Sequence, residues 1–306
     1  MLRTSDNQFN EPKTIESKPY LNKRYKLSFG EIIFSLSTTS HLDLTIPKPH
    51  ETFLVSEGKP DIFLTSEYGT VPSIQLDEKL FQTDGMWSLY RSNHRHVFHF
   101  QSPEIEDTPH RLAVIEPDYD SGTIYTRIKD SGREDCYNPF NYPLDEILTL
   151  SMLSRHRGMI VHACGIIYNN QGMLFIGTSG AGKTTLAESF REESGITLLS
   201  DDRIIIRNID NGYNIYGTPW HGDALIASQQ NASLKKIFFI KHDERNRLTE
   251  LRPIDAASRL FVCCFPTFWD TEGISSTLGL CERLSAQVPC YELGFVPDES
   301  VIELLR

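Results

Sequence analysis

One short segment constrains this chain more than any other: residues 177–184 read Gly-Thr-Ser-Gly-Ala-Gly-Lys-Thr. The segment fits the G-x-x-x-x-G-K-[ST] pattern of a phosphate-binding loop, the Walker A motif. The apolar residues Met173–Ile176 before it predict a strand, and residues 185–190 after it have helical character. A glycine-rich turn between a strand and a helix aims backbone N–H groups at an anion, at the positive end of the helix dipole. We therefore expect an α/β fold built around this loop.

The motif predicts a role for each of its residues. Lys183 can reach the β- and γ-phosphates of a nucleotide, and the Thr184 hydroxyl can ligate Mg²⁺. ATP and Mg²⁺ are therefore the expected cofactors. The alternative, a plain glycine-rich turn, does not explain the flanking strand and helix. The predicted nucleotide-binding residues are Gly177, Thr178, Ser179, Gly180, Ala181, Gly182, Lys183, Thr184 and Thr185.

Composition narrows the classes of partner. The 306 residues allow one large domain or two moderate ones. A net charge of −11 argues against nonspecific nucleic-acid binding and, more weakly, against an anionic membrane surface. No apolar run approaches the ~20 residues that span a bilayer, and the segment Met1–Lys13 is polar. We expect a cytoplasmic protein with reduced thiols, because its cysteines show neither a Cys-x-x-Cys pair nor zinc-site spacing.

The first half of the chain is predicted to be β-rich. Residues 1–24 are polar and aperiodic and predict a loose arm, and residues 25–137 predict a β-rich domain that recognises the acceptor. The strand-like segments are Lys26–Ser37, Glu51–Val55, Asp61–Thr65, Met86–Arg91, His96–Gln101 and Arg111–Ile115. The close spacing of His94, His96 and His99 leaves metal binding open, although a strand with exposed imidazoles, His94 and His96 on one face, explains it better.

Residues 138–306 are predicted to form the second domain. A helix is expected at Pro143–Arg157, and the strand Met159–Tyr168 should turn at residues 169–172 and return as Met173–Ile176. This β-hairpin leading into the phosphate loop differs from the crossover-linked parallel strands of common P-loop proteins. Further strands are expected at Ile196–Ser200, Arg203–Asn208, Tyr213–Gly217, Lys235–Lys241 and Cys290–Val296, and helices at Pro253–Cys264, Glu272–Ala286 and Asp298–Leu305.

Two adjacent carboxylates, Asp201 and Asp202, end the strand after the loop. Phosphoryl transfer needs a phosphate cradle, a divalent metal and a base for the attacking hydroxyl. Successive strand residues point to opposite sides, so the two carboxylates are predicted to do different work. We expect Asp201 to hold the metal and Asp202 to accept the proton. The alternative is a solvated turn or a helix cap.

Three further residues are candidates by position. His162 lies in the strand that precedes the loop in the predicted hairpin, where a structural histidine is equally compatible with the sequence. His221 and Asp223 lie in the rigid polar segment Gly217–Asp223, where Asp223 could add a metal ligand and His221 could contact phosphate or substrate. The alternative is a turn that packs Trp220 into the core.

Three segments together resemble the catalytic domain of the HPr kinase/phosphorylase superfamily, whose P-loop arrangement phosphoenolpyruvate carboxykinases share. They are His162-Ala163-Cys164-Gly165, Gly177–Thr185 and Leu199-Ser200-Asp201-Asp202. The resemblance covers about residues 143–306. It implies an HPr kinase-like P-loop domain in which Lys183 and Thr184 bind nucleotide and Mg²⁺ and Asp202 is the catalytic base. It also places Asp201 beside the metal and His162, the histidine before the loop, among the catalytic residues.

The segment Thr218–Asp223 is similar to stand-alone HPr kinase-like proteins, some of which phosphorylate a serine of a ribosomal peptide precursor. Relatives phosphorylate free serine. The resemblance therefore implies a kinase whose acceptor is an alcohol, most simply a serine of a peptide or protein. A free small-molecule alcohol such as serine and a nucleotide-binding regulatory module without phosphoryl transfer remain alternatives. The oligomeric state stays open, and a homo-oligomer is compatible with the sequence.

Overall fold

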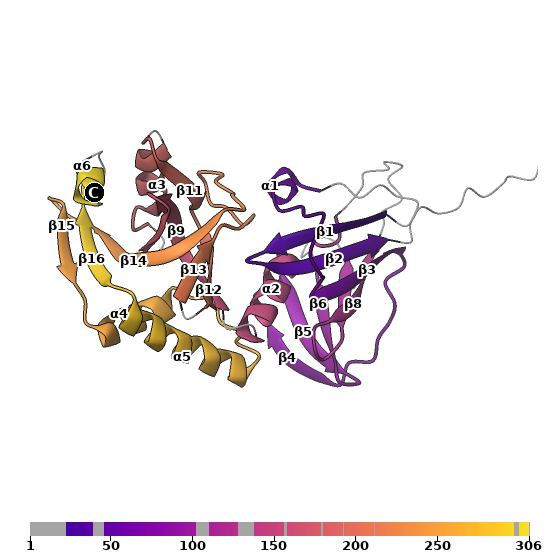
Figure 1. Cartoon of the computed structure of the whole chain (residues 1–306). Helices are drawn as coiled ribbons and strands as arrows, with labels where there is room; N and C mark the ends of the chain where they lie inside the picture. The colour runs from indigo at the N-terminus through magenta and orange to yellow at the C-terminus, as the bar shows by residue number, and fades with distance from the viewer. Residues whose placement is uncertain are drawn as a thin grey trace, which may run out of the picture.

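The structure, a computed structural model, describes residues 23–38, 46–101, 110–127, 138–155, 158–178, 180–191, 193–210, 212–296 and 300–305. Residues 1–22 of the predicted arm and Ser179 of the loop lie outside these ranges. The described chain forms two large mixed sheets, with most of its helices on the second sheet (Figure 1). The expectation of a mixed α/β protein that begins with a β-rich part is confirmed.

The first sheet has eight strands in the order β1-β2-β3-β8-β7-β6-β5-β4. Strand β3 pairs in parallel with β2 and with β8, and the other neighbours are antiparallel. A four-residue helix, α1 (Lys48–Glu51), lies between β2 and β3 in the chain. The strands are β1 (Lys23–Phe29), β2 (Ile32–Thr38), β3 (Ile62–Gly69), β4 (Glu78–Gln82), β5 (Trp87–Ser92), β6 (Arg95–Phe100), β7 (Arg111–Ile115) and β8 (Ser121–Arg127).

Three details of this half differ from expectation. The segment Lys26–Ser37 is a hairpin rather than one strand, because Gly30 and Glu31 take positive φ values of 56° and 62° and reverse the chain. The strand predicted at Glu51–Val55 is wrong. Proline in the first turn favours the start of a helix, so the chain forms α1 there. A turn follows α1, and its Leu54 forms only an isolated β-bridge. His94 lies in the turn between β5 and β6 and does not share a strand face with His96.

The second sheet follows the order β10-β9-β12-β13-β14-β16-β15, and β11 pairs with β9 beside this path. Strand β10 also pairs in parallel with β14, so the pairings from β9 to β14 close on themselves. The strands are β9 (Gly158–Tyr168), β10 (Gln171–Ile176), β11 (Ile196–Ser200), β12 (Arg203–Ile209), β13 (Gly212–Tyr216), β14 (Asn231–His242), β15 (Arg247–Glu250) and β16 (Cys290–Phe295). Strand β15 had no counterpart among the sequence predictions.

Helices cover both faces of this second sheet. Helices α4 (Pro253–Val262) and α5 (Thr271–Gln287) bury Leu260 and Leu284 against one face. Helices α3 (Lys183–Arg191) and α6 (Ser300–Leu305) bury Phe190 and Val301 against the other (Figure 1). The result is a three-layer arrangement in which the loop before α3 emerges at the end of β10.

The expected hairpin before the loop is confirmed. Strands β9 and β10 pair antiparallel, from Tyr168 opposite Gln171 to Ala163 opposite Ile176. Asn169 and Asn170 connect them with positive φ values of 49° and 60°. Two consecutive residues in this conformation form a type I′ turn, which asparagine tolerates better than most residues. The hairpin ends where the glycine-rich loop begins.

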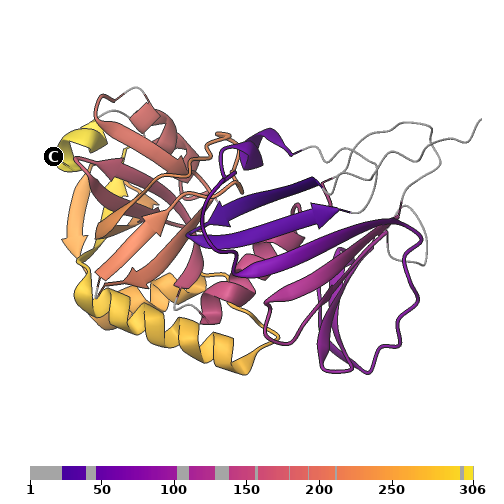
Figure 2. The same ribbon diagram turned by 45° about the vertical axis from the view of Figure 1, so that its right-hand side comes forward.

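A single apolar core joins the two halves. Helix α2 (Leu144–Arg155) lies between the sheets in both views (Figure 1, Figure 2). Its buried apolar residues belong to the same cluster as Phe29 of the first sheet, Ile160 and Ile205 of the second, and Trp220. Asp145 of α2 is fully buried. Its carboxylate accepts a hydrogen bond from Trp220 Nε1 at 2.9 Å and pairs with His50 Nε2 at 2.6 Å. Apolar packing and a buried polar cluster therefore both hold the halves together.

Among the described residues, no helix has the length and apolar character needed to cross a membrane.

Candidate functional site

A cavity of about 460 Å³ opens beside the N-terminal end of α3. Residues from five separate segments line it, and most of the predicted site residues are among them. The lining residues are His162, Gly180, Gly182, Lys183, Thr184, Thr185, Asp201, Asp202, Gly222, Asp223 and His242. The fold therefore brings the glycine-rich loop, the acidic pair and the segment around Gly222 to one place. Gly177 and Thr178 line a different cavity, together with Ile176 and Cys263.

The loop has the backbone that an anion cradle requires. Gly180 and Gly182 have φ values of +80° and +96°, a region that side chains with a Cβ rarely adopt. At Gly182 there is also no room: an added Cβ would lie 2.6 Å from Cζ of Phe295 and 2.9 Å from Cε1 of His242. The loop can thus approach a ligand closely with its backbone, directly before the first turn of α3.

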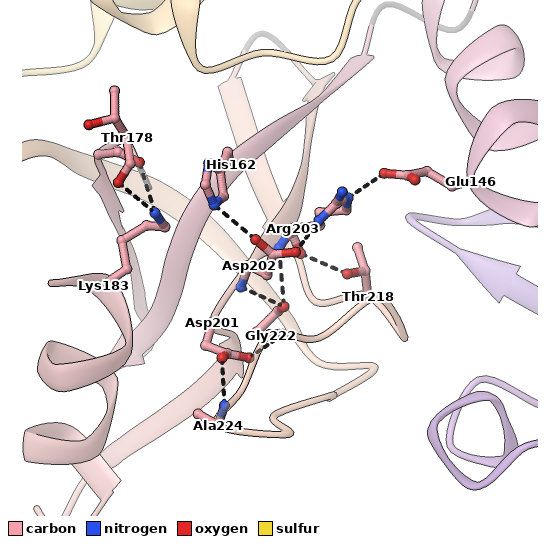
Figure 3. Close-up of polar contacts among 12 residues, drawn as sticks. Glu146, His162, Thr178, Lys183, Asp201, Asp202, Arg203, Thr218, Gly222 and Ala224 are labelled. Carbon is pink, nitrogen blue, oxygen red and sulfur yellow. Dashed lines mark hydrogen bonds and ion pairs between the residues drawn. The ribbon is translucent and has the colours of Figure 1, made fainter. Parts of the chain in front are cut away.

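Lys183 begins α3 and reaches back over the loop. Its Nζ donates to the carbonyl oxygens of Gly177 at 2.9 Å and Thr178 at 3.2 Å (Figure 3). Burial lowers the pKa of this ammonium group below its ordinary value, an effect that the nearby charge of Asp202 opposes. The lysine is 7% exposed, so it is a nearly buried cation whose partners are neutral carbonyls. An anionic ligand in the cavity would provide the missing countercharge.

Asp202 and His162 form the most distinctive contact of the site. His162 Nε2 lies 2.9 Å from Asp202 Oδ1, and both side chains are about one quarter exposed, at 26% and 22% (Figure 3). Burial raises the pKa of Asp202, but the His162 hydrogen bond and the charges of Arg203 and Lys183 outweigh it, so the pKa lies below its ordinary value. The carboxylate is therefore ionised at neutral pH and faces the same cavity as Lys183.

The second oxygen of Asp202 pairs with Arg203, which sequence reasoning missed. Arg203 bridges Asp202 Oδ2 and Glu146 Oε1 of α2, and its guanidinium lies 4.6 Å from the centre of the Phe265 ring. Burial lowers the pKa of Arg203, but the carboxylates of Glu146 and Asp202 raise it by a larger amount, so the pKa lies above its ordinary value. The only sequence signal was a basic residue directly after the acidic pair; Glu146 lies too far along the chain to be associated with it.

Asp201 has a different environment. Its side chain is buried, and its two oxygens accept the backbone N–H groups of Gly222 at 3.0 Å and Ala224 at 2.9 Å (Figure 3). The two aspartates thus diverge as the sequence predicted: Asp202 turns to His162 and Arg203, and Asp201 fixes the turn at residues 222–224. Through that turn Asp201 sets the position of Asp223.

The turn at residues 220–224 presents its two candidate residues, His221 and Asp223, to different cavities. Asp223 lines the cavity with the glycine-rich loop, together with Thr184 and Thr185. His221 lines a second cavity instead, and its Nδ1 lies 3.0 Å from the Gly222 carbonyl oxygen. Trp220 is largely buried in the shared core, where its indole N–H meets Asp145. The turn therefore both packs Trp220 and presents polar groups to the two cavities.

Strand pairing explains why the acidic pair lies here. Strand β9 pairs with β11 near one end and with β12 near the other, so Ser200 is opposite Gly165 and Arg203 is opposite His162. The acidic pair fills the bend between β11 and β12. The buried Ser200 hydroxyl accepts from the backbone N–H of Asp202 at 3.3 Å and of Arg203 at 3.4 Å, which holds this bend.

The donor set fits a nucleotide-bound divalent cation rather than a cage of protein ligands. Among the described residues, no group of three or more His, Cys, Asp and Glu side chains is arranged to hold a metal ion. Mg²⁺ commonly takes one or two carboxylates and completes its shell with water and substrate phosphates. Thr184, Asp202 and Asp223 all line the cavity and could supply such oxygens, whereas both oxygens of Asp201 already accept backbone N–H groups.

A comparison of the chain with protein-family models and with curated proteins finds no match.

Proposed function

We propose that this chain is an ATP- and Mg²⁺-dependent kinase that phosphorylates an alcohol, with a serine hydroxyl of a peptide or protein as acceptor. We further propose that residues 138–306 form an HPr kinase-like P-loop domain. One observation carries the proposal: the His162–Asp202 pair faces the same cavity as Lys183 and Thr184 at the start of α3. A phosphate cradle alone would support nucleotide binding, whereas an ionised carboxylate opposite the cradle gives the acceptor proton a destination.

The roles follow from position. The backbone of the loop and the start of α3 would bind the β- and γ-phosphates, and Lys183 would exchange its carbonyl partners for phosphate oxygens. Thr184 and Asp223, which line the cavity with Asp202, would hold Mg²⁺, and Asp201 would position Asp223. Bound Mg²⁺ would neutralise charge on the β- and γ-phosphates.

The transfer step is a displacement at phosphorus. The acceptor oxygen bonds to the γ-phosphorus while the bond from the γ-phosphorus to the β,γ-bridging oxygen breaks, and ADP leaves with that oxygen. The acceptor hydroxyl gives its proton to Asp202, whose position the His162 and Arg203 contacts fix. A low pKa makes Asp202 a weak base, but phosphoryl transfer passes through a loose transition state with little bond formation to the nucleophile. An ionised, correctly placed carboxylate is then sufficient.

The test is transfer from γ-labelled ATP to serine-containing peptides and to free serine, with phosphate release measured in parallel. Lys183→Ala should abolish transfer and weaken ATP binding while the fold survives, because the charge on the β/γ-phosphates is lost. Lys235→Ala, which removes an exposed lysine from β14, is the matched control and should behave as the unaltered chain. ATP binding with neither transfer nor hydrolysis would contradict the kinase proposal and indicate a regulatory nucleotide-binding module. Phosphate release without a labelled acceptor would indicate simple hydrolysis.

A further inference from the structure

A second cavity, of about 390 Å³, lies next to the first and shares Asp202 with it. Its walls come from distant parts of the chain: Pro47 before α1, Tyr142 before α2, Arg203 of β12, and Pro219 and Trp220 of the turn. It therefore lies where the β-rich half of the chain meets the second sheet.

The two cavities meet at the residue proposed as base. Asp202 is the one described residue that lines both the cavity of Lys183 and Thr184 and the cavity of Tyr142 and Trp220. A phosphoryl donor and an acceptor must approach from opposite sides of the transferred group, with the attacking and leaving oxygens roughly in line. An acceptor held in the second cavity would meet the nucleotide cavity at Asp202, the residue that would take its proton.

We propose that the second cavity is the acceptor site, and that it takes a peptide serine flanked by an apolar or aromatic residue in preference to free serine. The inference rests on the kinase activity proposed above and specifies its substrate.

The charges of the cavity argue against a small charged acceptor. Free serine carries an ammonium and a carboxylate, and both need countercharges when they leave water. Among the described residues that line the cavity, Arg203 is the one Lys or Arg and Asp202 the one Asp or Glu. Arg203 is already paired with Glu146 and Asp202, so it has no uncompensated charge to offer a carboxylate. A peptide serine has neutral amides at those positions and avoids this cost.

The apolar walls argue for a neighbouring side chain. Five of the nine described residues that line the cavity are proline, tyrosine or tryptophan, and Tyr142 is 49% exposed. Aromatic and proline surfaces bind apolar and aromatic groups by burial and ring packing. The volume is near the low end of small-ligand pockets, which run from roughly 300 to 1,000 Å³. It suits one residue and its neighbour rather than a folded domain.

The first experiment compares acceptors with the full chain, ATP and Mg²⁺. The probes are N-acetylated, C-amidated serine peptides with Phe, Leu, Gly or Asp on either side of the serine, and free serine. The expected result is the highest kcat/KM for peptides with Phe or Leu beside the serine, and at least about tenfold less for Asp-flanked peptides and free serine. Equal or faster phosphorylation of free serine, or no dependence on the flanking residue, would overturn the proposal.

The second experiment tests the location. Tyr142→Ala should raise KM for the Phe-flanked peptide about 3- to 10-fold, through lost aromatic contact, and leave ATP affinity unchanged. Phe63→Ala is the matched control, because Phe63 is also 49% exposed but lies on β3, outside both cavities. An unchanged KM in Tyr142→Ala, or the same rise in Phe63→Ala, would refute the assignment.

A binding measurement distinguishes a failure of the acceptor-site assignment from a failure of the proposed kinase activity. Affinity for the Phe-flanked peptide is measured with a nonhydrolysable ATP analogue present, on the unaltered chain and on Tyr142→Ala. Peptide binding that weakens in Tyr142→Ala, without any transfer by the unaltered chain, would leave the cavity assignment standing and refute the kinase. Transfer that strongly favours free serine would leave the kinase standing and refute the acceptor site.

Discussion

The two adjacent aspartates should fail in opposite ways when each is replaced by asparagine. Asp201→Asn turns one of two buried acceptor oxygens into an NH₂ group that faces a backbone N–H of Gly222 or Ala224. A buried donor left without an acceptor costs about 1–3 kcal/mol, so the free energy of unfolding should fall by about that amount. The turn that carries Asp223 should loosen, and ATP–Mg²⁺ affinity should fall with it.

Asp202→Asn should leave stability nearly unchanged and greatly slow the transfer step. The side chain is 22% exposed, Arg203 keeps Glu146 as a partner, and an amide oxygen can still accept one hydrogen bond. The stability loss should therefore stay below about 1 kcal/mol. The transfer rate at saturating ATP should fall roughly 10²- to 10⁴-fold, the usual contribution of a positioned base, while ATP affinity persists.

The assay is chemical denaturation of both variants together with single-turnover transfer and ATP binding. The reasoning fails if Asp201→Asn is as stable as the unaltered chain, because the two backbone hydrogen bonds would then contribute nothing. It also fails if Asp202→Asn transfers phosphate at the normal rate. A pattern in which Asp202→Asn is the unstable variant and Asp201→Asn the slow one would reverse the two roles.

Three further predictions follow from single contacts. Gly182→Ala should greatly weaken ATP binding, because the new Cβ would lie 2.6 Å from Phe295 at a φ of +96°. Gly180→Ala meets nothing within 4 Å and should cost only about 1 kcal/mol of strain, so equal effects of the two variants in a binding assay would contradict this prediction. The pKa of Asp202 lies below its ordinary value, so the contacts of its ionised form persist at neutral pH and weaken only as pH falls through the lowered pKa. A pH–rate profile should show no loss assigned to Asp202 between pH 8 and 5, and an acidic limb in that range that disappears in Asp202→Asn would refute this. Asp145→Ala should destabilise the chain by about 3–5 kcal/mol, read from urea denaturation, because it removes a fully buried carboxylate from its partners; a change below 1 kcal/mol would show that this buried cluster is not structural.

Local signals predicted much of the second half of the fold. The pair Asn169–Asn170 lies between two apolar runs and forms the expected hairpin turn, and the glycine-rich loop begins where β10 ends. The acidic pair ends β11, as the change from apolar to charged residues indicated. These features depend on residues that are neighbours in the chain, so periodicity and turn chemistry suffice to predict them.

Non-local features could not be predicted in this way. The ion pair of Arg203 with Glu146 joins residues 57 positions apart, and the second cavity combines Pro47, Tyr142 and Trp220. The predicted division into residues 25–137 and 138–306 gave no indication that Phe29 and Trp220 share one apolar cluster with α2. Helix α1 was not predicted, and its last residue, Glu51, was placed in an expected strand, because four residues are too few to show a helical period.

Strand β9 pairs with both β11 and β12, and Asp201 and Asp202 form the bend between those two strands. This pairing constrains the length of the bend more strictly than the identity of its residues. The pairing of β11 with β9 shifts between Leu198 and Ser200, but from Ser200 to Arg203 the chain advances as many positions as β9 does from Gly165 to His162, so the bend itself keeps one register along β9. Deleting or inserting one residue in the bend would shift β12 by one position and send Ile205 to the opposite face of the sheet. Substitutions at 201 and 202 leave that register intact. Variation among natural or selected sequences should therefore change the chemistry of this bend while its length stays constant, and a length change should unfold the second sheet before activity can be measured.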